Sequence, residues 1–151
     1  MKNRRLLWLL PLFVLFGQVA SAQQDDRRMK IELIVKQGSE TIVSTLTSAS
    51  MAYSRQSYAV DSSDLPVRNF NLAINFDKPA IQIIRAFIKN KNGLDGQIVT
   101  TDTYGKLPTR KMEFKSAVMD GLTDQITNDY STMYLTMRCT ELIIDGLKMD
   151  L

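Results

Sequence analysis

The period of the apolar residues changes within residues 69–92, and this change constrains the fold more than any other feature of the chain. In its first part every second residue is apolar, and the residues between them are mostly Asn. Alternation of this kind is typical of a strand with one buried face. The alternating residues are Phe70, Leu72, Ile74 and Phe76.

Beyond Asp77 the apolar residues follow a helical period instead. The pattern predicts an amphipathic helix from about Lys78 to Asn90. Asp77 is placed to accept a bond from the first turn, and Pro79 stands where a missing N–H costs nothing. The stripe expected to pack on the rest of the fold is Ile81, Ile84 and Ile88, widened by Ala80, Ile83 and Phe87, with Arg85 and Lys89 left for water or a neighbouring subunit.

No second helix is expected downstream of residue 22, and the remaining segments read as strands separated by turns. Residues 122–129 read as a polar connector, and residues 41–53 as one long strand or two short ones. Residues 111–120 alternate, with Met112, Phe114, Ser116 and Val118 on one face. The pattern predicts a mainly β fold, a small antiparallel barrel of two packed sheets with one flanking helix. The strands are expected at residues 29–35, 41–53, 69–76, 97–103, 111–120 and 132–145.

The first 22 residues have the layout of a secretory signal peptide. Lys2, Arg4 and Arg5 precede an apolar run over residues 6–16, and small residues follow at positions 20–22. The alternative is a membrane anchor, but the run is shorter than the ~20 residues that span a bilayer. We expect cleavage between Ala22 and Gln23, a short flexible lead-in at residues 23–28, and one domain over residues 29–151.

The three basic residues of this segment account for the whole formal net charge of +3. The rest of the chain is electrically balanced, so its composition gives no support for a nucleic-acid partner. With the segment removed, no membrane association is expected either. Cys139 is the only cysteine, which excludes an intramolecular disulfide.

The chain contains no His, and this excludes the usual catalytic triads and His-based metal sites. No phosphate-binding loop is present, and no cofactor or metal is expected. The remaining candidates for acid–base chemistry are carboxylates in polar segments, where turn formation or solvation explains them better. These are Asp61 and Asp64 in one segment, and Asp120, Asp124 and Asp129 in another.

Three side chains of the last predicted strand are further candidates for a chemical role. Cys139 has apolar neighbours and is expected to be a buried, unreactive thiol. Arg138 and Glu141 are expected on opposite faces of that strand, each paired or exposed at an interface, and neither is assigned to catalysis. No catalytic residue is therefore expected, and the enzyme hypothesis is weak.

Two segments resemble the Hcp family, the tube proteins of type VI secretion systems. The passage from Asn71 to Ala80 (NLAINFDKPA) is similar to that family's strand-to-helix junction. Residues 110–119 and 134–144 are similar to its closing pair of strands, and the order of strands, helix and strands also agrees. The resemblance covers most of residues 29–145.

The resemblance implies a non-enzymatic structural protein that self-assembles into a hexameric ring. Rings of this family stack into a tube that leaves the cell and can carry effectors in its lumen. Tube proteins of the family ordinarily lack a signal peptide, so residues 1–22 are a departure. The chain is therefore either an independently secreted relative, or it retains the segment for another purpose. Little sequence follows the last predicted strand, which limits ring-to-ring contacts there.

A second hypothesis is a monomeric exported β-domain that binds a sugar, a peptide or an envelope partner. A deep pocket lined by aromatic residues would favour it. A third is an enzyme that uses loop carboxylates such as Asp61 or Asp124, for which no reaction can be named. The ring-forming structural protein is the preferred hypothesis.

Overall fold

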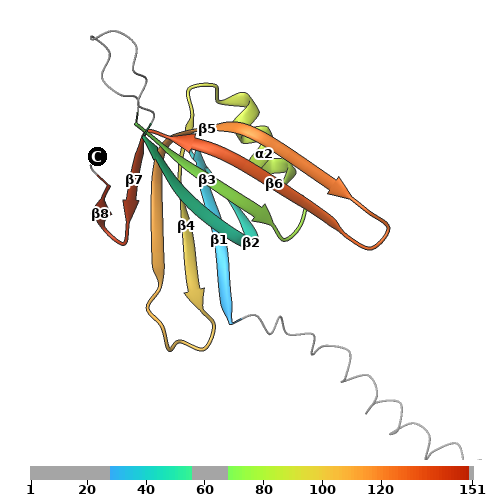
Figure 1. The fold of residues 1–151 in the computed structure, drawn as a ribbon, viewed down its shortest axis with the longest axis horizontal. Helices are drawn as coiled ribbons and strands as arrows, with labels where there is room; N and C mark the ends of the chain where they lie inside the picture. Colours follow the sequence, from blue (N-terminus) through green and yellow to red (C-terminus); the bar gives the residue numbers. More distant parts are fainter. Residues whose placement is uncertain (1–27, 56–67, 150–151) are drawn as a thin grey trace, which may run out of the picture.

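The computed structural model describes residues 28–55 and 68–149. In this part of the chain eight strands surround a core and one helix flanks them (Figure 1). The prediction of a mainly β fold with a single flanking helix is confirmed. The elements are β1 (Met29–Gln37), β2 (Glu40–Arg55), β3 (Arg68–Phe76), α2 (Ile81–Lys89), β4 (Leu94–Asp102), β5 (Arg110–Ile126), β6 (Ser131–Cys139), β7 (Glu141–Ile144) and β8 (Leu147–Lys148).

The strands form one antiparallel sheet that closes on itself. Its order is β4-β1-β2-β3-β6-β5-β7-β8, and a further pairing of β4 with β5 completes a barrel. Closure leaves the two-residue β8 as a short outer strand on β7. The expected small antiparallel barrel is therefore the observed architecture.

Two strands, β2 and β5, take part in both halves of the barrel. β2 pairs with β1 as far as Leu46 and with β3 beyond it, with an irregularity between Leu46 and Ser48. β5 pairs with β4 up to Ala117 and with β6 from Val118 onward. The barrel is thus built from two packed sheets. We call β2 (residues 48–55), β3, β6 and β5 (residues 118–126) the four-stranded sheet.

The core lies between the two sheets and is almost entirely aliphatic and aromatic. Alternate residues of β3 and β6 supply much of it, as their period-2 patterns predict. Asp102 is the one buried charged residue among those described. The largest fully buried side chains are Phe76, Phe114, Leu33, Leu72, Ile74, Ile83, Leu135, Met137, Leu142, Val35 and Cys139.

The helix is shorter than predicted and starts later. It covers Ile81–Lys89, its N-cap residue is Ala80, and no side chain caps it, so the capping role predicted for Asp77 is wrong. The backbone N–H of Asp77 still donates to the Thr45 carbonyl of β2 at 3.2 Å. The chain therefore leaves the sheet only after Asp77. At the other end the Asn90 side chain donates to the Ala86 carbonyl at 2.7 Å.

The predicted packing face of the helix is only partly right. Ala80, Ile83 and Phe87 are buried as predicted, together with Ala86, but Ile81 and Ile88 are 56% and 60% exposed. Apolar residues cover more than half of the circumference, and only part of so wide an arc can contact the core. Sequence period alone could not decide which part does so.

Two strand predictions need correction as well. Residues 122–129, predicted as a connector, belong largely to β5, which continues to Ile126. The single strand predicted over residues 132–145 is broken at Thr140 into β6 and β7. The break changes the inward-facing positions from Cys139 to Leu142, so Glu141 and Ile143 are not in the core. Residues 41–53 do form one long strand, within β2.

The bend in β5 depends on a close approach between two backbones. Ser116 has φ 49° and is exposed, although the predicted alternation put it on one face with Phe114, which is buried, while Ala117 is buried beside it. The Asp95 carboxylate accepts the Ser116 N–H at 2.9 Å and stabilises the bend. Gly93 lies against this point, because a Cβ there would be 2.5 Å from the Ser116 carbonyl carbon.

We therefore expect Gly93→Ala to destabilise the fold more than Gly105→Ala. Both glycines have positive φ, +89° and +66°, but a Cβ at Gly105 meets nothing within 4 Å. The control should lose about 1–2 kcal/mol from the conformation alone, and Gly93→Ala a further about 1–3 kcal/mol from the clash. Urea unfolding followed by circular dichroism measures both; equal losses would contradict the close approach.

Asp102 organises the loop between β4 and β5. Its carboxylate accepts the N–H groups of Tyr104, Lys106 and Leu107 at 2.9–3.2 Å and lies 3.7 Å from the Arg28 guanidinium. Burial raises the pKa of Asp102, but the three N–H donors and Arg28 outweigh it, so the net pKa lies below 3.8.

Because this pKa is depressed in the folded state, the Asp102 contribution to stability is complete well above pH 3.8 and is lost as pH falls toward the folded-state pKa. We expect Asp102→Asn to be less stable than the wild type at pH 7. The difference between the two should narrow as pH falls below 3.8. Glu40→Gln, at the exposed first residue of β2, is the control. Thermal unfolding across this pH range measures the effect, and a constant difference would contradict it.

Candidate assembly surface

The outer face of the four-stranded sheet carries small, polar side chains. These outward-facing residues alternate along each strand with buried residues. Ile74 and Leu135 are two of the buried ones, and they pair with each other across β3 and β6. Three complete rows cross all four strands, from β2 through β3 and β6 to β5. They are Ser48, Asn75, Tyr134 and Thr123; Ser50, Ala73, Thr136 and Gly121; and Ala52, Asn71, Arg138 and Val118.

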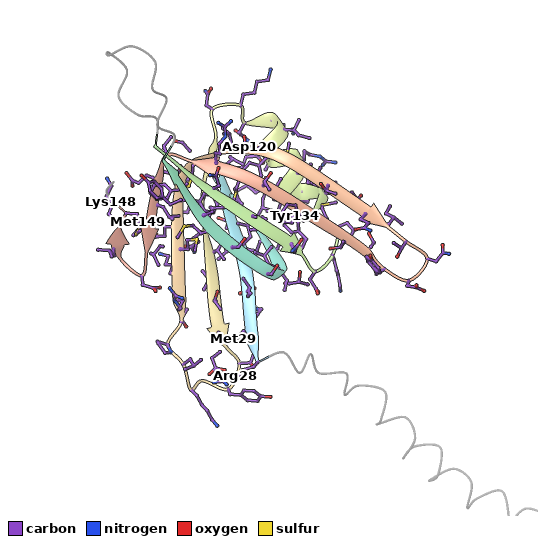
Figure 2. All side chains as sticks on the ribbon, in the orientation of Figure 1. Arg28, Met29, Asp120, Tyr134, Lys148 and Met149 are labelled. Atoms are coloured by element: carbon purple, nitrogen blue, oxygen red, sulfur yellow. The ribbon has the colours of Figure 1, made fainter. Side chains whose placement is uncertain are left out.

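This outer face is close to electrically neutral. Among the described residues, its charged side chains are Arg138 on β6 and Asp120 on β5, which form an ion pair at 2.6 Å. The Asn75 amide donates to the Ser48 hydroxyl at 2.9 Å, so polar groups on this face also bond to one another. Figure 2 labels Asp120 and Tyr134 on the β5–β6 hairpin. The outer face is therefore hydrophilic and has no strong electrostatic potential, positive or negative.

Both lateral edges of the four-stranded sheet lack a partner strand in the described part of the chain. β4 occupies one edge of β5 only as far as Ala117, so that edge is open from Val118 to Ile126. β1 occupies one edge of β2 only as far as Leu46, so that edge is open from Ser48 onward. Open edges present unpaired N–H and C=O groups that can pair with another strand.

The carboxylates considered for chemistry do not converge on a site. Asp120 is paired with Arg138, while Asp124 and Asp129 are exposed near the end of the β5–β6 hairpin. Asp61, Asp64 and the expected cleavage position at Ala22 and Gln23 lie outside the described residues. Within the described residues no group of acidic residues or cysteine could hold a metal ion.

The other two candidate side chains are also paired or buried. Glu141 pairs with Lys148 at 2.9 Å, on β7 rather than on the strand that carries Arg138. Cys139 is 1% exposed, and burial raises the pKa of its thiol to about 11. The prediction of a buried thiol that behaves as a small hydrophobic residue is confirmed.

Apart from an open depression on the helix, two cavities formed by described residues could hold a small molecule. One, of about 270 Å³, lies where β2 diverges from β1 and is lined mainly by Met, Ile and Thr with Arg110, Lys111 and Asp145. The other, of about 280 Å³, lies beside Asp77 and Thr103. Neither is lined by an aromatic side chain, so neither gives the aromatic pocket that a sugar-binding domain would need.

Sequence reasoning missed two exposed apolar surfaces, one on the helix and one on the β5–β6 hairpin. The sequence signal for the hairpin is weak, because three polar residues separate Leu122 from Ile126, and only the Thr-Asn-Asp turn that follows marks its end. The Thr127 side chain and the Tyr130 backbone close that turn.

The fold is that of Hcp proteins, as three solved structures show. Hcp1 from Flavobacterium johnsoniae superposes with a TM-score of 0.56 at 13% identity, covering 81% of this chain and 99% of its own. Hcp1 from Salmonella typhimurium gives 0.58 at 9% identity, covering 77% and 85%. A third structure, described only as an Hcp protein, gives 0.51 at 9% identity, covering 78% and 92%.

These likenesses establish the fold, and at such low identity they establish nothing further. No protein-family model matches the sequence, and no curated protein matches it. In the described residues, α2 is too short to cross a bilayer, and no other helix could do so.

Proposed function

We propose that this protein is a non-enzymatic structural subunit that assembles head to tail into a hexameric ring. The observation that supports the proposal most directly is the pair of open edges on opposite sides of one sheet. A ring needs a heterologous contact, in which one surface of each copy meets a different surface of the next. The open edges of β5 and β2 are two such surfaces.

The direction of the strands also suits this contact. All neighbours in the four-stranded sheet are antiparallel, so β2 and β5, at its two ends, run in opposite directions. When β5 of one copy lies beside β2 of the next, the joint is antiparallel too. The alternation then continues without interruption around the ring, and both open edges of the four-stranded sheet are paired.

The composition of the edges supports the same conclusion. Monomeric proteins protect exposed edges with Lys, Pro or inward-pointing charges. Residues 48–53 of β2 contain none of these, and residues 118–126 of β5 contain neither Lys nor Pro, with Asp124 as the one charge on the side that faces the core. The neutral outer face would then line the lumen, where a secreted effector could pass without being held by charge.

The proposed ring predicts a specific pattern of amide hydrogen exchange. Light scattering on the purified protein should give the mass of six copies. In the ring, the N–H groups that point out of residues 118–126 and 48–53 should exchange more slowly than after dilution to the monomer, because they acquire carbonyl partners. The β8 edge at Leu147–Lys148 is the control and should not change.

A single copy at high concentration, or a hexamer whose two edges exchange as fast as those of the monomer, would contradict edge pairing. The first outcome would leave the monomeric exported β-domain as the remaining hypothesis.

Export is the second part of the proposal. Residues 1–22 direct the chain out of the cytoplasm, and cleavage leaves Gln23 as the first residue of a lead-in to the single domain. N-terminal sequencing of the protein recovered from the medium and the periplasm should begin at Gln23. Deletion of residues 2–16 should leave the protein in the cytoplasm, and unprocessed wild-type protein found only there would contradict export.

A further inference from the structure

The helix carries an apolar surface that the fold does not cover. Ile81, Ile84 and Ile88 line a shallow depression on α2 together with Arg85 and Lys89, and we call these five residues the helix stripe. Ile81 and Ile88 are more than half exposed, although the opposite side of the helix is buried in the core. A helix of nine residues with so much isoleucine in water marks a contact surface.

A second exposed apolar surface lies on the β5–β6 hairpin. Leu122, Asp124 and Ile126 alternate along β5 and share the face that points toward the core, because Leu122 pairs with the fully buried Leu135. Leu122 is 41% and Ile126 75% exposed, because the hairpin projects past the helix (Figure 1). With Tyr130 and Asp129 at the turn, these residues form what we call the hairpin patch.

The two surfaces are complementary in charge. The helix stripe combines isoleucines with Arg85 and Lys89, and the hairpin patch combines apolar residues with Asp124 and Asp129. In the described part of the chain none of these four charged side chains forms an ion pair. Each surface therefore offers the apolar area and the charge that the other one needs.

The topology places both surfaces on the same side and at the same end of the four-stranded sheet. The helix follows Phe76, which pairs with Met133, and Met133 pairs with Asp124 of the hairpin patch. The helix also contacts β2, whose edge is open to the next copy. A neighbour joined through these edges would bring the patch of one copy beside the stripe of the other.

We propose that the helix stripe of each copy docks onto the hairpin patch of the next copy of this chain. The inference rests on the proposed ring, to which it adds a second layer of contact behind the paired strands. Each copy contributes one stripe and one patch, so the contact is heterologous and every copy in a closed ring makes it twice. The second copy is the occupant because the complementary surface is on the chain itself.

Engineered cysteines test the contact, since Cys139 is buried and its pKa of about 11 keeps it unreactive at neutral pH. Ile126→Cys combined with Ile81→Cys or with Ile88→Cys, expressed from the complete coding sequence, should give disulfide-linked oligomers up to the hexamer on mild oxidation. A disulfide needs Cα atoms within roughly 7 Å, so only surfaces in contact will form it. The control replaces the helix position by Leu147→Cys, on β8 and 68% exposed, and should give no more cross-linking than the wild type.

Charge reversal provides a second test of the same contact. Arg85→Glu should weaken assembly by about twofold to fivefold, the range for an exposed ion pair, and Asp129→Arg in the same chain should restore it. Light scattering against concentration measures both, and circular dichroism checks that the variants fold.

The outcomes separate the two proposals. A hexamer that cross-links no better than the control, with no rescue by the double change, would overturn the docking and leave the ring intact. Equal cross-linking by Ile126→Cys alone would also overturn it, because the hairpins would then meet each other. If the wild-type protein forms no hexamer, both the ring and the docking are overturned.

Discussion

The fold depends on two strands that each belong to both sheets. β2 and β5 change partners in mid-strand, at Leu46 and at Ala117, and these changes allow eight strands to close around one core. They also place strict demands on the local backbone. Ser116 adopts a positive φ, Asp95 satisfies its N–H, and Gly93 leaves room for it. Beyond the points where β1 stops pairing with β2 and β4 stops pairing with β5, those edges of β2 and β5 have no partner strand among the described residues. Barrel closure and edge exposure therefore have the same cause.

Sequence reasoning found the parts of the fold that a local period determines. The alternation of Phe70 to Phe76 and the helical period after it gave the strand, the helix and their order. It failed where tertiary contacts decide. Thr140 looks like any other strand residue. The strand breaks there because its partner β5 has a positive φ at Ser116, between Lys115, which pairs with Glu141, and Val118, which pairs with Arg138. Residues 122–126 look polar because half of β5 extends past the core, so their strand character is held by pairing with β6 and not by burial.

The helix shows the same limit more clearly. Its apolar arc includes both the buried Ile83, Ala86 and Phe87 and the exposed Ile81 and Ile88. A hydrophobic period reports that a face is apolar and says nothing about which partner covers it. The carboxylate candidates could not be settled from sequence for a related reason. Asp102, the only charged residue buried in the described chain, stabilises a loop through three backbone bonds, and its burial has no local sequence signal.

The exposed features of this domain fit together only if they are considered as a set. An open β edge alone is a hazard for aggregation, and an isoleucine stripe alone lowers solubility. Here the edges lie at opposite ends of one antiparallel sheet, and the stripe and the patch lie on the same side of that sheet. The proposed head-to-tail contact between identical copies would pair the edges and cover both apolar surfaces in one geometry. In a binding domain that acts alone, the edges would bond only to water and both apolar surfaces would stay exposed to it.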